Sequence, residues 1–178
     1  MPSLDKDDGK KRLDKVLKRY TEALEEKAVG KLSEQDVTTK FVLPMLEAFG
    51  WDMYKVEAEG PEVQEKALKD KSDVAKGLPD IKLSSENGVV FVEVKKPPLQ
   101  NKNVSNLFRY EDSDLVVLTS FEDLIVYTRY KKGKPKARFH FNFKSYSEHF
   151  DKLWNLLSNT KKGKATRAAI KATRYFRL

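Results

Sequence analysis

The chain of 178 residues contains no cysteine and only two histidines, His140 and His149. The lack of cysteine excludes a disulfide framework, a thiol nucleophile and a cysteine-based zinc site. With so few imidazoles, a histidine-based metal centre is poorly supported, and we expect both histidines to pack or to lie on the surface. Neither a signal peptide nor an apolar membrane span can be recognised, so we expect a cytoplasmic protein.

Positive charge is what the chain has in excess. Its 35 lysines and arginines outnumber 27 acidic residues, and the net charge of +8 suggests a polyanionic partner such as DNA. Residues 131–138 form one basic segment, and a C-terminal set forms another: Lys161, Lys162, Lys164, Arg167, Lys171, Arg174 and Arg177. Both could contact phosphates, although lysine runs also serve as solubilising surface.

The composition, 39% hydrophobic, suits one soluble α/β domain with a moderate core. We expect an N-terminal helix (1–30), a core that carries the candidate site (31–145), and a C-terminal helix with a basic tail (146–178). Strands are predicted at 51–58, 63–68, 114–119, 124–129 and 138–143, and further helices at 103–110 and around 150–157.

Two apolar runs carry the most informative charged residues. Asp80 precedes the first run, and Glu93 and Lys95 stand at the end of the second. Asn87-Gly88 between them is a hairpin-turn signal. An even-numbered loop pairs even positions with odd ones, which places all three charged residues on one face of the hairpin. An odd loop or a bulge would separate them.

Such a face has a definite chemistry. Two neighbouring carboxylates repel unless a cation lies between them, and Mg²⁺ prefers oxygen ligands. The backbone carbonyl of Val94 could add a ligand, and Lys95 could position or deprotonate a bound water that attacks phosphorus. Phosphodiester hydrolysis is one interpretation; the other is that these charges form an ordinary solvated strand end.

A helix is predicted from the start signal Ser33-Glu34-Gln35-Asp36 to Gly50. Apolar residues recur along it at helical spacing, at Val37, Phe41, Met45 and Ala48. Glu34 shares their side and is expected to point inward, whereas Glu47 lies on the polar side. Alternatively, Glu34 only stabilises the positive N-terminus of the helix.

Pro79-Asp80, Glu93-Val94-Lys95 and the acid-bearing helix resemble the PD-(D/E)XK nuclease superfamily. From about Leu32 to Leu157 the chain is similar to the N-terminal nuclease domain of type I and type IIG restriction enzymes. The resemblance implies an α/β fold with a restriction-endonuclease-like core, in which helices flank a central mixed β-sheet.

The resemblance also implies roles for individual residues. Asp80 and Glu93 would bind Mg²⁺, for which Mn²⁺ would substitute, Lys95 would be the catalytic lysine, and Glu34 the helix acid. The family often carries a Q-x-x-x-Y motif on the helix that follows the lysine, where this chain has Asn106 and Tyr110. These two lie on one helical face and could reach a DNA backbone or steady Lys95, or Tyr110 could simply pack; Lys96 is a further candidate for DNA contact.

The resemblance implies a Mg²⁺-dependent DNA endonuclease that is the cleavage module of a larger restriction system. There is no G-x-x-x-x-G-K-[ST] phosphate loop, and Pro97-Pro98 lacks the flanking residues of an amino-methyltransferase motif, so other domains or subunits would supply translocation, methylation and specificity. Two copies could combine as a homodimer for double-strand cleavage. The alternatives are a non-catalytic DNA-binding or assembly domain with the same fold, and a stand-alone repair or junction nuclease.

Overall fold

The computed structural model of the chain describes residues 4–53, 79–99, 113–128 and 136–172. In these residues one mixed sheet has the order β1-β2-β3-β4-β5, with β2 and β3 parallel and the other neighbours antiparallel. The strands are β1 (Ile81–Ser85), β2 (Gly88–Val94), β3 (Leu115–Thr119), β4 (Asp123–Thr128) and β5 (Lys136–Asn142).

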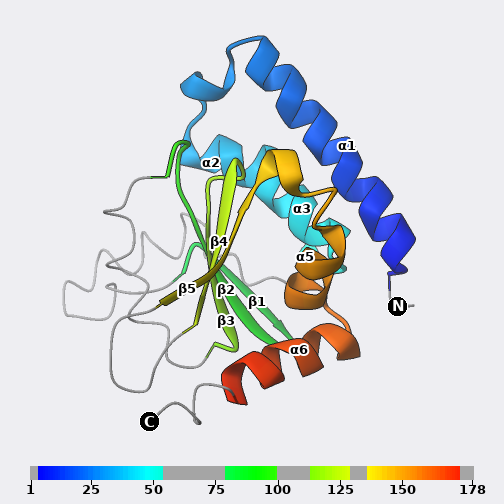
Figure 1. Cartoon of the computed structure of the whole chain (residues 1–178). Coiled ribbons are helices and arrows are strands. Elements are labelled where there is room, and N and C mark those ends of the chain that lie inside the picture. Colours follow the sequence, from blue (N-terminus) through cyan, green and yellow to red (C-terminus); the bar gives the residue numbers. More distant parts are fainter. Residues whose placement is uncertain (1–3, 54–78, 100–112, 129–135, 173–178) are drawn as a thin grey trace, which may run out of the picture.

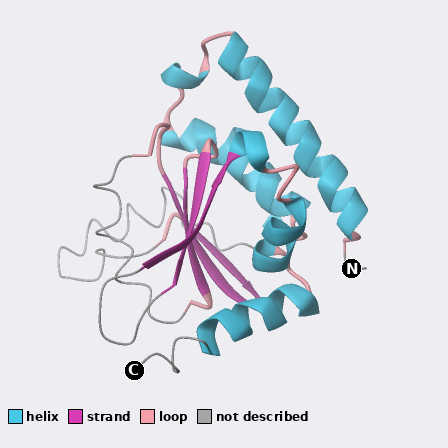
Figure 2. Ribbon diagram, viewed as in Figure 1, coloured by secondary structure: helices cyan, strands magenta, loops and turns pink. Residues whose placement is uncertain are grey.

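Helices flank this sheet, which confirms the expected α/β class (Figures 1 and 2). They are α1 (Lys6–Glu25), α2 (Glu34–Val37), α3 (Leu43–Ala48), α5 (Phe150–Leu157) and α6 (Lys161–Ala172), with 3-10 turns η1 (Val29–Lys31) and η5 (Phe143–Ser145). Figure 1 shows α1 along the outside of the molecule and α2 and α3 between it and the sheet. None of the helices in the described ranges is long and apolar enough to cross a membrane.

The two faces of the sheet differ in what they bury. Alternate side chains of β2 point to opposite faces, and Val90, Val92 and Val94 belong to the large core that also contains Leu13, Met45 and Leu153 of the helices. Phe91 lies on the other face in a smaller cluster with Val116, Leu118 and Tyr127. Because Glu93 and Lys95 follow Phe91 at intervals of two residues, they share its face.

The β1–β2 hairpin has the even-numbered loop that the sequence suggested. Ser85 pairs with Gly88, so the two-residue turn is Glu86–Asn87, one residue earlier than the Asn87-Gly88 signal indicated. Gly88 has a φ of +117°, and an added Cβ there would collide with the carboxylate of Asp114. Since Ile81 pairs with Val92, the register places Asp80 opposite Glu93.

The predicted second helix begins as its sequence indicated. The side chain of Ser33 accepts a hydrogen bond from the backbone of Asp36, whose carboxylate accepts from the backbone of Ser33 in return. In place of one uniform α-helix, a π-helical segment η2 (Thr38–Val42) joins α2 to α3. Pro44, the second residue of α3, has no N–H to donate to the carbonyl four residues earlier, which favours a wider turn here.

Most of the remaining elements agree with the sequence. The first helix, the strands β3, β4 and β5 and the helix α5 are confirmed within a few residues. The strand expected from Trp51 is not present at 51–53; instead Trp51 is buried and its indole N–H donates to the carbonyl of Leu157 at 2.7 Å. Residues 54–68 and the helix expected at 103–110 lie outside the described residues.

Candidate active site

Three carboxylates and one backbone carbonyl surround the ammonium of Lys95. Its Nζ lies 2.9 Å from Oε1 of Glu93, 3.6 Å from Oδ2 of Asp80 and 3.6 Å from Oε2 of Glu34. It also donates a hydrogen bond of 2.8 Å to the carbonyl oxygen of Val94. The structure therefore brings together all four acidic and basic residues that the sequence nominated as catalytic.

The hairpin itself positions three of these groups. The amide of Val94 donates to Oδ2 of Asp80 at 2.7 Å, which ties the first acid to the end of β2. Glu93 and Lys95 point to the same face because they are two residues apart on an extended chain. The amide of Lys95 donates to the carbonyl of Thr119 at 2.9 Å, so the neighbouring parallel strand fixes its backbone.

Glu34 comes from the helical layer and reaches the cluster from the first turn of α2. The hydroxyl of Thr38 donates to the carbonyl of Glu34 at 2.8 Å, which adds a bond within that turn. The side chain of Glu34 points toward Lys95, but it is 49% exposed and therefore not buried in the interior. Glu47 lies elsewhere, on the exposed surface between α1 and α3.

The cluster carries an unbalanced charge. Burial raises the pKa of Asp80 above its ordinary value and the charge of Glu93 raises it further, against the opposing effects of the Val94 amide and Lys95. Burial by itself lowers the pKa of Lys95, but the hydrogen bond with Glu93 and the surrounding carboxylates outweigh it and raise that pKa. Lys95 is therefore an ammonium at neutral pH, and it is the single cation among three carboxyl groups.

The donors in this cluster are the type that Mg²⁺ takes. Carboxylate and carbonyl oxygens are hard ligands. Those of Asp80, Glu93 and Val94 all lie within 3.6 Å of one cation, the Lys95 ammonium. Among the described residues, no group of three or more His, Asp or Glu side chains is arranged to coordinate a metal ion. The residues present fit a divalent cation if the ammonium of Lys95 moves aside.

Not every nominated residue can be placed. Asn106 and Tyr110 lie outside the described residues, as do residues 131–135 of the first basic segment. Lys96 is exposed at the end of β2, beside the cluster. Sequence reasoning overlooked the carbonyl of Thr119, since the parallel pairing of β2 with β3 leaves no local signal in the sequence.

One residue of the predicted basic tail has a different role. Arg167 of α6 is 1% exposed and cannot contact a phosphate at the surface. Its guanidinium donates to the carbonyls of Leu156, Ser158 and Asn87 at 2.9, 3.0 and 2.9 Å, which joins α6 to the end of α5 and to the hairpin turn. Assigning it to a DNA-binding tail was wrong because one-dimensional charge runs do not reveal burial. Lys161, Lys162 and Lys164 of the same helix are exposed.

No protein-family model matches the chain, and neither a curated protein nor a solved structure matches it significantly. The function of this chain therefore has to follow from the residues and the geometry of the site.

Proposed function

We propose that the chain is a Mg²⁺-dependent DNA endonuclease of restriction type, the cleavage module of a larger restriction system. The observation that carries this proposal is the convergence of Asp80, Glu93, Glu34 and the Val94 carbonyl on Lys95. These groups come from a hairpin and a separate helix, so their convergence is a property of the fold. Carboxyl groups crowded in a half-buried site favour a bound cation, and a metal cation can stabilise the charge that develops when a phosphodiester is hydrolysed.

Each residue has a role in this proposal. Asp80, Glu93 and the Val94 carbonyl would hold the metal, which supplies a polarised water and neutralises charge at the phosphate when it is bound. Lys95, kept protonated by its carboxylate neighbours, donates hydrogen bonds that orient the attacking water and offset the charge that develops on the phosphate oxygens. Glu34, whose Oε2 is 3.6 Å from Nζ of Lys95, would help to position the lysine.

DNA is the proposed substrate because the chain as a whole is basic while the site is acidic. Lys96, which is exposed and follows Lys95 in the sequence, is the candidate for contact with phosphates near the site. Methyltransferase, helicase or specificity functions would belong to other domains or subunits, and a homodimer would supply two sites for double-strand cleavage.

A non-catalytic DNA-binding or assembly domain is the second candidate. The observation that favours it is that the ammonium of Lys95 already occupies the space between the carboxylates. A permanently closed cluster would satisfy its charges without a metal and would not turn over.

Plasmid cleavage separates these two candidates. Supercoiled DNA is incubated with the purified chain in Mg²⁺, in Mn²⁺ or in chelator, and nicked and linear products are measured. We expect cleavage with either metal, none in chelator, and none for Glu93→Gln or Lys95→Ala. As a matched control, Lys10→Ala removes an exposed lysine of α1 next to Gly9, which packs beside Ala48 at the end of the helical segment away from Glu34, and should leave cleavage unchanged. Absence of metal-dependent cleavage, while the wild type still binds DNA, would support the second candidate.

A further inference from the structure

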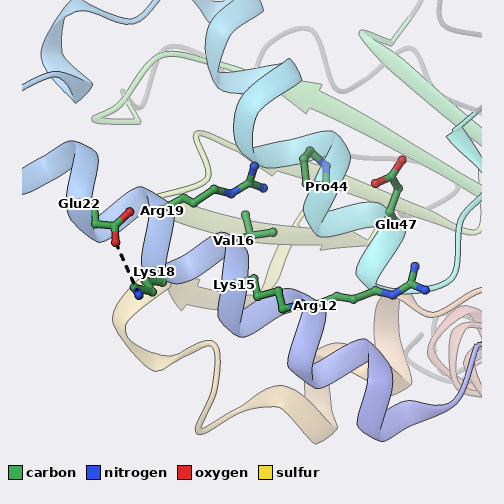
Figure 3. Close-up of a pocket in the computed structure, with 8 residues that line it drawn as sticks. All are labelled: Arg12, Lys15, Val16, Lys18, Arg19, Glu22, Pro44 and Glu47. Carbon is green, nitrogen blue, oxygen red and sulfur yellow. Dashed lines mark ion pairs between the residues drawn. The ribbon is translucent and has the colours of Figure 1, made fainter.

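A basic groove lies between α1 and α3, outside the carboxylate cluster. It has a volume of about 570 Å³ and is lined by Arg12, Lys15, Val16, Lys18, Arg19, Glu22, Pro44 and Glu47. Figure 3 shows the side chains of Arg12 and Arg19 extending from α1 toward the helix that carries Pro44 and Glu47. Buried Val16 and half-buried Pro44 contribute the apolar part of the lining, and the charged side chains are exposed.

The cations in this groove are only partly neutralised by their surroundings. Lys18 forms an ion pair with Glu22 at 3.9 Å. Of the residues that the structure describes, none forms an ion pair with Arg12, Lys15 or Arg19. Positive side chains gathered along one helix repel one another, so an anion bound between them would relieve that repulsion.

The arrangement suits a chain of phosphates better than a single anion. Arg12 and Arg19 are seven residues apart on α1, so their backbones are about 10 Å apart along the helix axis, with Lys15 between them. One nucleic acid strand carries a phosphate for about every 3.4 Å of rise. Guanidinium groups bind phosphate oxygens in pairs, and the lysine adds a mobile charge between the two arginines.

We propose that the groove between α1 and α3 binds the phosphate backbone of a nucleic acid. Pro44 and Glu47 are 10 and 13 residues from Glu34 along the same helical segment, which corresponds to about 15–20 Å. A nucleic acid in the groove is therefore distinct from one in the carboxylate cluster, although five or six base steps of about 3.4 Å could connect them. Binding here does not depend on whether the carboxylate cluster is catalytic.

Glu47 gives this proposal a directional test. Its carboxylate lines the same groove as Arg12, Lys15 and Arg19 and would repel phosphate. Replacing Glu47 by lysine should strengthen binding, whereas replacing Arg12, Lys15 and Arg19 by glutamine should weaken it. A gain and a loss of affinity in the same groove cannot both arise from damage to the fold.

The experiment measures binding of a fluorescent DNA duplex in chelator, where metal-dependent cleavage cannot occur. Affinity falls with salt, and the steepness of the plot of log affinity against log salt should decrease by about 2 to 3 for the triple variant and increase by about 1 for Glu47→Lys, since each phosphate contact on B-DNA contributes about 0.9. The control Lys10→Gln/Lys11→Gln/Lys144→Gln loses the same charge outside the groove and should change the slope by less than about 1.

Two outcomes would overturn the proposal. One is that the triple variant and the control have the same affinity and salt slope, since charge at any position would then explain the binding. The other is that poly-glutamate displaces the duplex from the wild type at a lower charge concentration than unlabelled DNA does. The groove would then be a docking surface for an acidic protein. A loss of plasmid cleavage without a change in duplex binding would concern the carboxylate cluster alone.

Discussion

Replacing Lys95 by methionine tests whether one shared cation holds the carboxylate cluster together. The side chain of Lys95 is 19% exposed, and that of Glu93, its closest partner, is 7% exposed. Methionine fills a similar volume and is flexible, but it carries no charge. The substitution therefore leaves Asp80, Glu93 and Glu34 facing one another without the ammonium between them.

The size of the effect can be worked from the distances. At an effective dielectric constant of about 20, unit charges interact by about 6 kcal/mol at 2.9 Å and by about 5 kcal/mol at 3.6 Å. Solvent screens the contributions of Asp80 and Glu34, whose side chains are 41% and 49% exposed. Desolvation of Lys95 offsets much of the remainder. We expect the free energy of unfolding to fall by about 3 kcal/mol, the lower end of the range for breaking a buried pair.

The loss should depend on pH in a predictable direction. Because the pKa of Lys95 is raised, its stabilising contribution is fully present below the ordinary lysine pKa and disappears only as the pH rises through the higher folded value. The difference in stability between the variant and the wild type should therefore be present in full at neutral pH and shrink only at alkaline pH.

Urea unfolding of four proteins measures this effect: the wild type, Lys95→Met, Glu93→Gln and the double variant. At neutral pH, the double-mutant cycle should give a coupling energy of about 2 kcal/mol between the two side chains. The reasoning is refuted if Lys95→Met is as stable as the wild type at neutral pH. It is equally refuted if the coupling energy is zero within error.

Three further predictions concern other parts of the site and fold. Asp80→Asn removes a carboxylate whose pKa is raised by burial, so the wild type should lose stability relative to this variant as the pH rises above about 4. Calorimetry should also show that the variant binds Mn²⁺ more weakly, and an unchanged Mn²⁺ affinity would exclude Asp80 as a ligand. Glu34→Gln should abolish most cleavage while changing the melting temperature little, because the residue is half exposed; unchanged cleavage would limit Glu34 to stabilising the helix N-terminus. Arg167→Leu should lower the free energy of unfolding by about 3 kcal/mol or more, since three buried or half-buried carbonyls lose their donors; a loss below about 0.5 kcal/mol in urea unfolding would show that α6 does not depend on these bonds.

Local patterns in the sequence determined the hairpin and the helix starts. The alternation of side chains along an extended chain follows from backbone geometry, so Glu93 and Lys95 share a face wherever β2 lies in the molecule. The two-residue loop then determined which residue of the first strand they meet. The Ser33–Asp36 capping pattern also involves residues close in sequence, and it correctly located the start of the second helix. All of these features depend on residues close together in the sequence.

Only the tertiary structure decided how the elements meet. Glu34 is separated from Lys95 by 61 residues of sequence, and its distance from Nζ depends on how α2 lies across the end of the sheet. The same is true of the Thr119 carbonyl, which requires parallel pairing of β2 with β3. Arg167 is the clearest case, because exposed Lys161, Lys162 and Lys164 precede it in the same helix and its burial depends on α5 and the hairpin turn. Contacts between distant segments depend on packing, which no local pattern encodes.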